Sequence, residues 1–142
     1  MPHSSDMIRA HPRKSELDIK RLSECIDECF SCAETCVMCA DACLGEQNLP
    51  SLIRCIRLNQ DCADTCLATG RILSRQVDPD WTAIRSQVEA CATACRSCGA
   101  ECERHASHHA HCKTCAESCR SCEQSCQQIL KEIPARVVGA RA

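Results

Sequence analysis

Several features that are common in proteins are scarce or missing in this sequence of 142 residues. It has one tryptophan, Trp81, one phenylalanine, Phe30, and no tyrosine. Its net charge is −2, so it lacks the basic excess that favours nucleic-acid binding. No segment shows the strict alternation of apolar and polar residues that is typical of a β-strand. The sequence therefore predicts an all-α protein that does not bind nucleic acid.

A targeting signal is also missing from the first residues. Residues 1–14 lack the apolar stretch of about 7–15 residues that a secretory signal needs, and no twin-arginine signal or membrane-spanning run follows them. We therefore expect a cytoplasmic protein, in which thiols stay reduced. The segment is polar and contains Pro2 and Pro12, which is typical of a flexible N-terminal arm or a short accessory helix.

The abundant residue is cysteine, with 18 copies. So high a share usually indicates a small secreted protein held together by disulfides. The spacing argues against a disulfide framework here, because many of the cysteines are four residues apart. Side chains at that spacing on one helix point the same way and are poorly placed to bond to each other.

The longest series of cysteines steps by four, three, four, three and four residues. It comprises Cys25, Cys29, Cys32, Cys36, Cys39 and Cys43. Residues three and four apart share one face of a helix, and their alternation gives the 3.5-residue period of a buried helical seam. The series predicts a helix that turns a row of thiols toward the interior.

Three later segments carry cysteines at related spacings. Their cysteines are Cys55, Cys62 and Cys66; Cys91, Cys95, Cys98 and Cys102; and Cys112, Cys115, Cys119, Cys122 and Cys126. Short connections between four such helices make neighbours antiparallel. We predict an antiparallel four-helix bundle with a cysteine-lined core over residues 15–133, followed by a C-terminal tail over residues 134–142.

Capping signals predict where the four helices begin and end. Ser15 is a candidate cap for the first helix, and Gly45 ends it. Asn48–Pro50 opens the second helix, and Asp78 is the candidate cap of the third. The fourth helix is expected to run through Ile133.

When the four helices are aligned side by side, the two ends of the thiol core differ in their residues. Aliphatic residues fill one end; they are Leu17, Leu22, Ile72, Leu73, Ile84, Val88, Ile129 and Ile133. A histidine-rich turn lies at the other end. His105 and His108 continue the third and fourth seams and are the first candidates to hold or pass a metal ion there, with His109 and His111 next. A solvated polar turn is the alternative interpretation.

Thiolates are soft ligands that select Cu(I), Zn(II) or iron–sulfur clusters. Zinc usually takes closed sets of four ligands, and iron–sulfur ligands lie mostly on loops. A ferritin-like di-iron site is not expected, because the chain has no Glu-x-x-His. Cu(I) fits best, because each Cu⁺ replaces one thiol proton and adds no charge to the core, which predicts about one ion per cysteine.

Other functions stay open on this basis. A zinc or general thiophilic-metal buffer and a thiol redox protein are the main alternatives, and a core of thiols used only for packing is a third. No nucleophile–base pair, phosphate-binding loop or open catalytic metal site indicates an enzyme.

The repeated Cys-x-x-x-Cys-x-x-Cys spacing, together with the histidine turn before Cys112, resembles the bacterial copper storage proteins. The cytosolic branch is the better match, because the exported branch carries a twin-arginine signal. The resemblance covers about residues 15–133. It implies a four-helix bundle, many Cu(I) ions held by core thiolates, and assembly into a homotetramer.

A bundle with one open end predicts different effects for the two ends of the first series. Cys43 lies beside the histidine turn, and Cys25 lies against the aliphatic end. Replacing Cys43 should change the rate of Cu(I) uptake more than the capacity, and replacing Cys25 should do the reverse. Stopped-flow uptake and the copper content at saturation measure the two quantities, and equal effects on rate would contradict a single open end.

Overall fold

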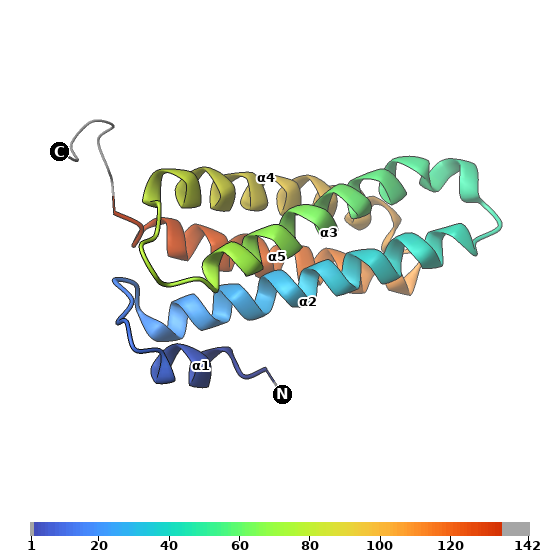
Figure 1. Cartoon of the computed structure of the whole chain (residues 1–142). Coiled ribbons are helices and arrows are strands. Elements are labelled where there is room, and N and C mark those ends of the chain that lie inside the picture. The colour runs from blue at the N-terminus through green and yellow to red at the C-terminus, as the bar shows by residue number, and fades with distance from the viewer. Residues whose placement is uncertain (1, 135–142) are drawn as a thin grey trace.

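The computed structural model describes residues 2–134, and these form helices and turns (Figure 1). In chain order the elements are α1 (Ser4–Ala10), α2 (Ile19–Leu44), the 3₁₀ helix η1 (Leu49–Leu52), α3 (Ile53–Leu73), α4 (Trp81–His105) and α5 (Ala110–Leu130). The prediction of an all-α protein is confirmed for the described residues.

The four long helices form a bundle in which each packs against two others. Helix α2 contacts α3 and α5, and α4 contacts the same two helices. The α2–α3 and α4–α5 connections lie at one end, and the α3–α4 connection lies at the other (Figure 1). This is the antiparallel four-helix bundle that the sequence predicts.

The start of α2 differs from the predicted one. Its cap is Asp18, whose carboxylate accepts a hydrogen bond from the backbone N–H of Arg21 at 3.0 Å. Ser15 instead accepts from the N–H of Leu17 at 3.1 Å, within the preceding turn. The prediction of Ser15 as the cap was therefore wrong, because an Asp directly before the first helical residue satisfies the free N–H group.

The cap of α4 is also shifted. Asp80 accepts from the N–H groups of Thr82 and Ala83 at 3.1 and 3.2 Å. Asp78, the predicted cap, has a φ of 51° and lies in the turn before the helix. A residue in that left-handed conformation turns the chain, which leaves the capping position to Asp80.

The end of the bundle opposite the histidines is closed by aliphatic side chains, as predicted. Leu17, Leu22, Leu73, Ile84, Val88, Ile129 and Ile133 are buried, and Ile72 packs against them while partly exposed. Helix α5 ends at Leu130, earlier than predicted, and Ile133 reaches the core from the following turn. Within residues 2–134, no helix has the length and apolarity needed to cross a membrane.

The short accessory helix, one of the two possibilities for the N-terminal segment, is present as α1. It packs on α2 with Ile8 buried, and the Ser4 hydroxyl donates to the carbonyl of Ser23 at 3.4 Å. Residues 135–142, most of the predicted tail, lie outside the described part of the chain.

The aliphatic end predicts where the empty protein is most sensitive to mutation. Leu22 is fully buried, so Leu22→Ala should lower the free energy of unfolding by about 2–5 kcal/mol through lost burial and a cavity. Leu44, on the same helix, is 57% exposed, and Leu44→Ala should change it by less than about 0.5 kcal/mol. Denaturant titrations of the reduced, metal-free variants measure both changes. Equal losses of unfolding free energy in the two variants would contradict a stabilising role for the aliphatic end.

Candidate metal centre

All eighteen cysteines lie in the interior of the bundle as free thiols. None is more than 2% exposed. Helices α2, α3, α4 and α5 each turn their seam inward, as the spacing predicts. The structure has no disulfide among these cysteines, and the core is lined with sulfur along most of its length.

The sulfur atoms of different helices are close enough to share metal ions. Cys66 Sγ lies 3.6 Å from Cys95 Sγ across α3 and α4, and Cys36 Sγ lies 3.8 Å from Cys115 Sγ across α2 and α5. With metal–sulfur bonds of about 2.3 Å, an ion bonded to three sulfurs spaces them about 4 Å apart. Metal can therefore bind here with little movement of the helices.

Groups of potential ligand atoms within 4.8 Å of one another are distributed along the core. Four of the groups are linked by the shared residues Cys32, Cys36, Cys119 and Cys122, and a fifth lies at the histidine end. The groups are Cys29–Cys91–Cys122–Cys126; Cys32–Cys66–Cys95–Cys122; Cys32–Cys36–Cys62–Cys119; Cys36–Cys98–Cys115–Cys119; and, at the histidine end, Cys39–Cys43–His111–Cys112. Shared sulfurs make this arrangement suited to bridged, multinuclear binding rather than to separate closed sites.

Within residues 2–134, no lysine or arginine side chain is buried in the thiol core. The buried polar side chains there are Ser23, Asn59, Thr69 and Glu101. Burial raises the pKa of Cys43 to about 11, and burial likewise raises the pKa of Cys112. The thiols of Cys43 and Cys112 are therefore protonated at neutral pH when no metal is bound, and a cation must displace those protons.

Asn59 is a buried amide in the middle of the thiols, and it was not among the predicted site residues. Its Oδ1 lies 3.0 Å from Cys115 Sγ and 3.1 Å from Cys98 Sγ, so it accepts from both thiols. The residue lies four after Cys55 and three before Cys62, which places it on the α3 seam. That spacing was the available signal, and the geometry offers a metal ion one oxygen among the sulfurs.

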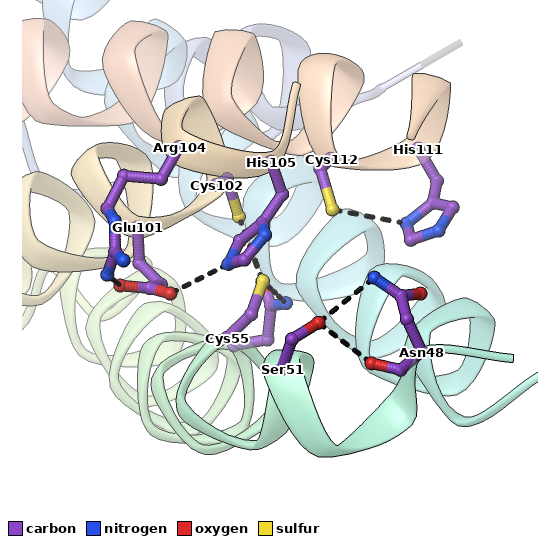
Figure 2. Close-up of polar contacts among 10 residues, drawn as sticks. Asn48, Ser51, Cys55, Glu101, Cys102, Arg104, His105, His111 and Cys112 are labelled. Carbon is purple, nitrogen blue, oxygen red and sulfur yellow. Dashed lines mark hydrogen bonds and ion pairs between the residues drawn. The ribbon is translucent and has the colours of Figure 1, made fainter. Parts of the chain in front are cut away.

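His111 is the histidine that meets the thiols most directly. Its Nδ1 lies 3.4 Å from Cys39 Sγ and 3.6 Å from Cys112 Sγ. Figure 2 shows the ring beside Cys112. His105 follows Cys102 by three residues on α4, and the sulfurs of Cys102 and Cys55 are 3.8 Å apart. These two histidines border the open end, which we call the mouth.

Two carboxylates hold the mouth histidines in place. Glu101 Oε2 accepts from His105 Nε2 at 2.9 Å, and Arg104 binds the other oxygen at 2.9 Å (Figure 2). Glu46 Oε2 lies 2.9 Å from His111 Nε2, and this hydrogen bond lowers the pKa of Glu46. Each ring is thus fixed through Nε2, a common way of orienting a metal-binding imidazole.

The remaining two predicted histidines lie apart from the thiols. His109 Nδ1 binds Glu46 at 2.6 Å and so reaches the mouth through that carboxylate. His108 is exposed, and its side chain makes no hydrogen bond with any residue of 2–134. The structure therefore brings His111 to the thiols, holds His105 on Glu101 one turn after Cys102, and leaves His108 at the surface.

The Asn59 geometry leads to a stability prediction. Asn59→Ala removes the acceptor for two buried thiols and should lower the free energy of unfolding of the metal-free protein by about 1–3 kcal/mol. The neighbouring Gln60 is exposed, so Gln60→Ala serves as the control and should be close to neutral. Urea unfolding under reducing conditions distinguishes the two, and equal stability of both variants would contradict the role of the amide.

Three solved structures similar to this chain hold or store copper. Ccsp, the copper storage protein of Streptomyces lividans loaded with 10 copper equivalents, is 47% identical with a TM-score of 0.89, over 91% of this chain and 98% of that one. A cytosolic copper storage protein of Streptomyces lividans with five coppers is 51% identical with a TM-score of 0.78, over 79% and 93%. Cu(I)-bound BsCsp3 is 33% identical with a TM-score of 0.67, over 75% and 94%.

A family model agrees with these structures. The model for Csp, the copper storage protein family, matches residues 18–131, which span the bundle from the cap of α2 to the residue after α5. Both comparisons cover the four helices that carry the thiols. The chain therefore belongs to the copper storage protein family.

Proposed function

We propose that this protein stores Cu(I) on the thiolates of its core. The main support for the proposal is the run of four sulfur groups linked by shared cysteines, from the group that contains Cys126 to the group that contains Cys115, with a fifth group at the mouth. The copper bound by the similar proteins supports it. Storage needs many adjacent sites of one kind, and shared thiolates provide them.

Charge determines how the core fills. Each Cu⁺ that displaces one thiol proton leaves the interior neutral, so the cost of burying charge does not grow with loading. Full replacement corresponds to about one copper per cysteine, or about eighteen. Zn²⁺ at the same density would leave buried positive charge, which counts against the zinc-buffer alternative.

Copper enters at the mouth in this proposal. His111 offers an imidazole nitrogen beside the outermost thiols, His105 lies one turn after Cys102, and Asn59 offers an oxygen deeper in the core. Imidazole is a weaker partner for Cu(I) than thiolate, so an ion held there passes on to sulfur. The opposite end is closed by aliphatic side chains.

Three further statements belong to the proposal. The protein acts in the cytoplasm, as does the cytosolic Streptomyces lividans protein that it resembles. It has no catalytic activity, because storage requires only binding. It assembles as a homotetramer through exposed apolar side chains of α2 and α3, which include Val37, Met38 and Ile53 at 59, 65 and 63% exposure.

A thiol redox function is less well supported by the geometry. Redox catalysis by cysteine needs an accessible thiolate of low pKa. The eighteen thiols are buried, and burial raises the pKa of Cys43 and of Cys112, two of the thiols at the mouth. The arrangement favours metal binding over exchange with another protein's disulfide.

Anaerobic titration of the reduced protein with Cu(I), against a strong competing ligand, tests storage. We expect uptake of many ions with about one proton released per copper, as followed by a pH indicator. Because protons compete for the same thiolates, affinity per copper should fall about tenfold for each unit of decreasing pH. Saturation at one or two ions per chain would contradict storage, and equally tight uptake of Zn²⁺ would favour a general buffer.

A further inference from the structure

One carboxylate oxygen at the mouth is shared by two imidazoles. Glu46 Oε2 lies 2.6 Å from His109 Nδ1 and 2.9 Å from His111 Nε2. The two rings also stack, with their centroids 5.4 Å apart. Both nitrogens therefore approach the same oxygen from neighbouring rings. We call these three residues the outer trio. Their side chains are 11 to 30% exposed, so the trio is partly shielded and still reached by water.

The donor atoms of the outer trio differ in kind from those of the core. Two imidazole nitrogens and one carboxylate oxygen are the ligands of open zinc sites, in which water takes the fourth position. Cu(I) prefers sulfur, so the trio and the core select different ions. We propose that the outer trio is a second metal site, which binds one divalent cation of the zinc class.

The trio is placed to join two segments that are distant in sequence. Glu46 lies in the turn after α2, and His109 and His111 lie at the start of α5. His109 occupies the capping position of α5 but its side chain makes no capping hydrogen bond, because its Nδ1 is directed at Glu46. A bound cation would replace the shared hydrogen bonds with three metal–ligand bonds and fix the two segments at the mouth.

His111 belongs to both sites through its two nitrogens. Nε2 lies in the outer trio, and Nδ1 lies 3.4 Å from Cys39 Sγ. A neutral imidazole has one N–H and one lone pair. When Nε2 donates to Glu46, the lone pair of Nδ1 faces the thiols and can take Cu(I). When a divalent ion occupies the lone pair of Nε2, the proton is on Nδ1 and points at sulfur.

The two ions therefore compete for His111. A divalent cation on the trio lowers the affinity of the mouth for Cu(I), and Cu(I) on Nδ1 lowers the affinity of the trio by the same factor. This coupling rests on the proposed copper storage, whereas the divalent site itself rests only on the three side chains. The deeper thiol groups do not touch the trio, so the effect is confined to the mouth.

Co²⁺ is the probe for the site, because its absorption spectrum separates thiolate ligands from nitrogen and oxygen ligands. Wild-type protein, loaded with Cu(I) short of the amount that fills the mouth and then titrated with Co²⁺, should bind one Co²⁺ per chain without sulfur-to-cobalt charge-transfer bands. Glu46→Gln and His109→Gln should bind it at least tenfold more weakly, roughly the smallest effect expected for a residue at a metal site. Circular dichroism checks that these variants are folded.

His108→Gln is the matched control, since it removes an exposed imidazole from the same turn. It should bind Co²⁺ like the wild type. Equal weakening in His108→Gln and Glu46→Gln, or thiolate bands from the single bound Co²⁺, would overturn the proposed site. The coupling predicts that Co²⁺ speeds removal of about one Cu(I) per chain by a chelator in the wild type and not in Glu46→Gln; no acceleration would overturn the sharing of His111.

Copper storage and the outer metal site can fail independently, and the measurements distinguish the two failures. If the wild type takes up only one or two Cu(I) ions, storage is wrong. Co²⁺ added to the empty protein then still decides the outer site, because cobalt bound by the trio and cobalt bound by thiols give separate bands. Normal Cu(I) capacity, together with no nitrogen- and oxygen-bound Co²⁺ when the mouth is free of Cu(I), would refute the outer site alone.

Discussion

The burial of eighteen thiols without a balancing cation is the constraint on which the rest of the structure depends. A protonated thiol is a small apolar group, so the empty core can pack as an ordinary interior. A thiolate in the same place is costly unless a positive charge accompanies it. The core is therefore stable in two forms, filled with protons or filled with monovalent cations, and exchange between them leaves its net charge unchanged.

The bundle makes this exchange possible by keeping the helices fixed while the sulfurs change partners. Sulfur atoms from different helices already lie 3.6 to 4.0 Å apart in pairs such as Cys66–Cys95 and Cys29–Cys91. The aliphatic end supplies apolar packing that does not depend on metal, with Leu22, Val88 and Ile129 fully buried. The mouth has the opposite character, since imidazoles held by carboxylates replace apolar packing there. One end of the core thus provides stability and the other provides access.

The bundle and its thiol core could be predicted from the sequence, because a 3.5-residue period of cysteines indicates which face of a helix is buried. The spacing of Cys25 to Cys43 identified the seam, and the aliphatic residues identified the closed end. Exact caps could not be predicted, since Ser15 and Asp18 are both good capping residues and only the local turn decides between them. The roles of Asn59 and Glu46 depend on contacts between segments that are distant in sequence, whereas Glu101 holds His105 four residues away on α4. Spacing along one helix does not show that Glu46 orients His111, so it favoured His108 over His111.

Storage in the core requires that Cu(I) fills the interior along the whole series of sulfur groups. Diffraction from crystals of the Cu(I)-loaded protein, with anomalous scattering recorded on both sides of the copper absorption edge, tests it most directly. We predict copper peaks that extend along the bundle axis from the group containing Cys126 to the group containing His111, each peak beside two or more sulfurs. Copper confined to the surface, or to one isolated site in an otherwise metal-free core, would contradict the account.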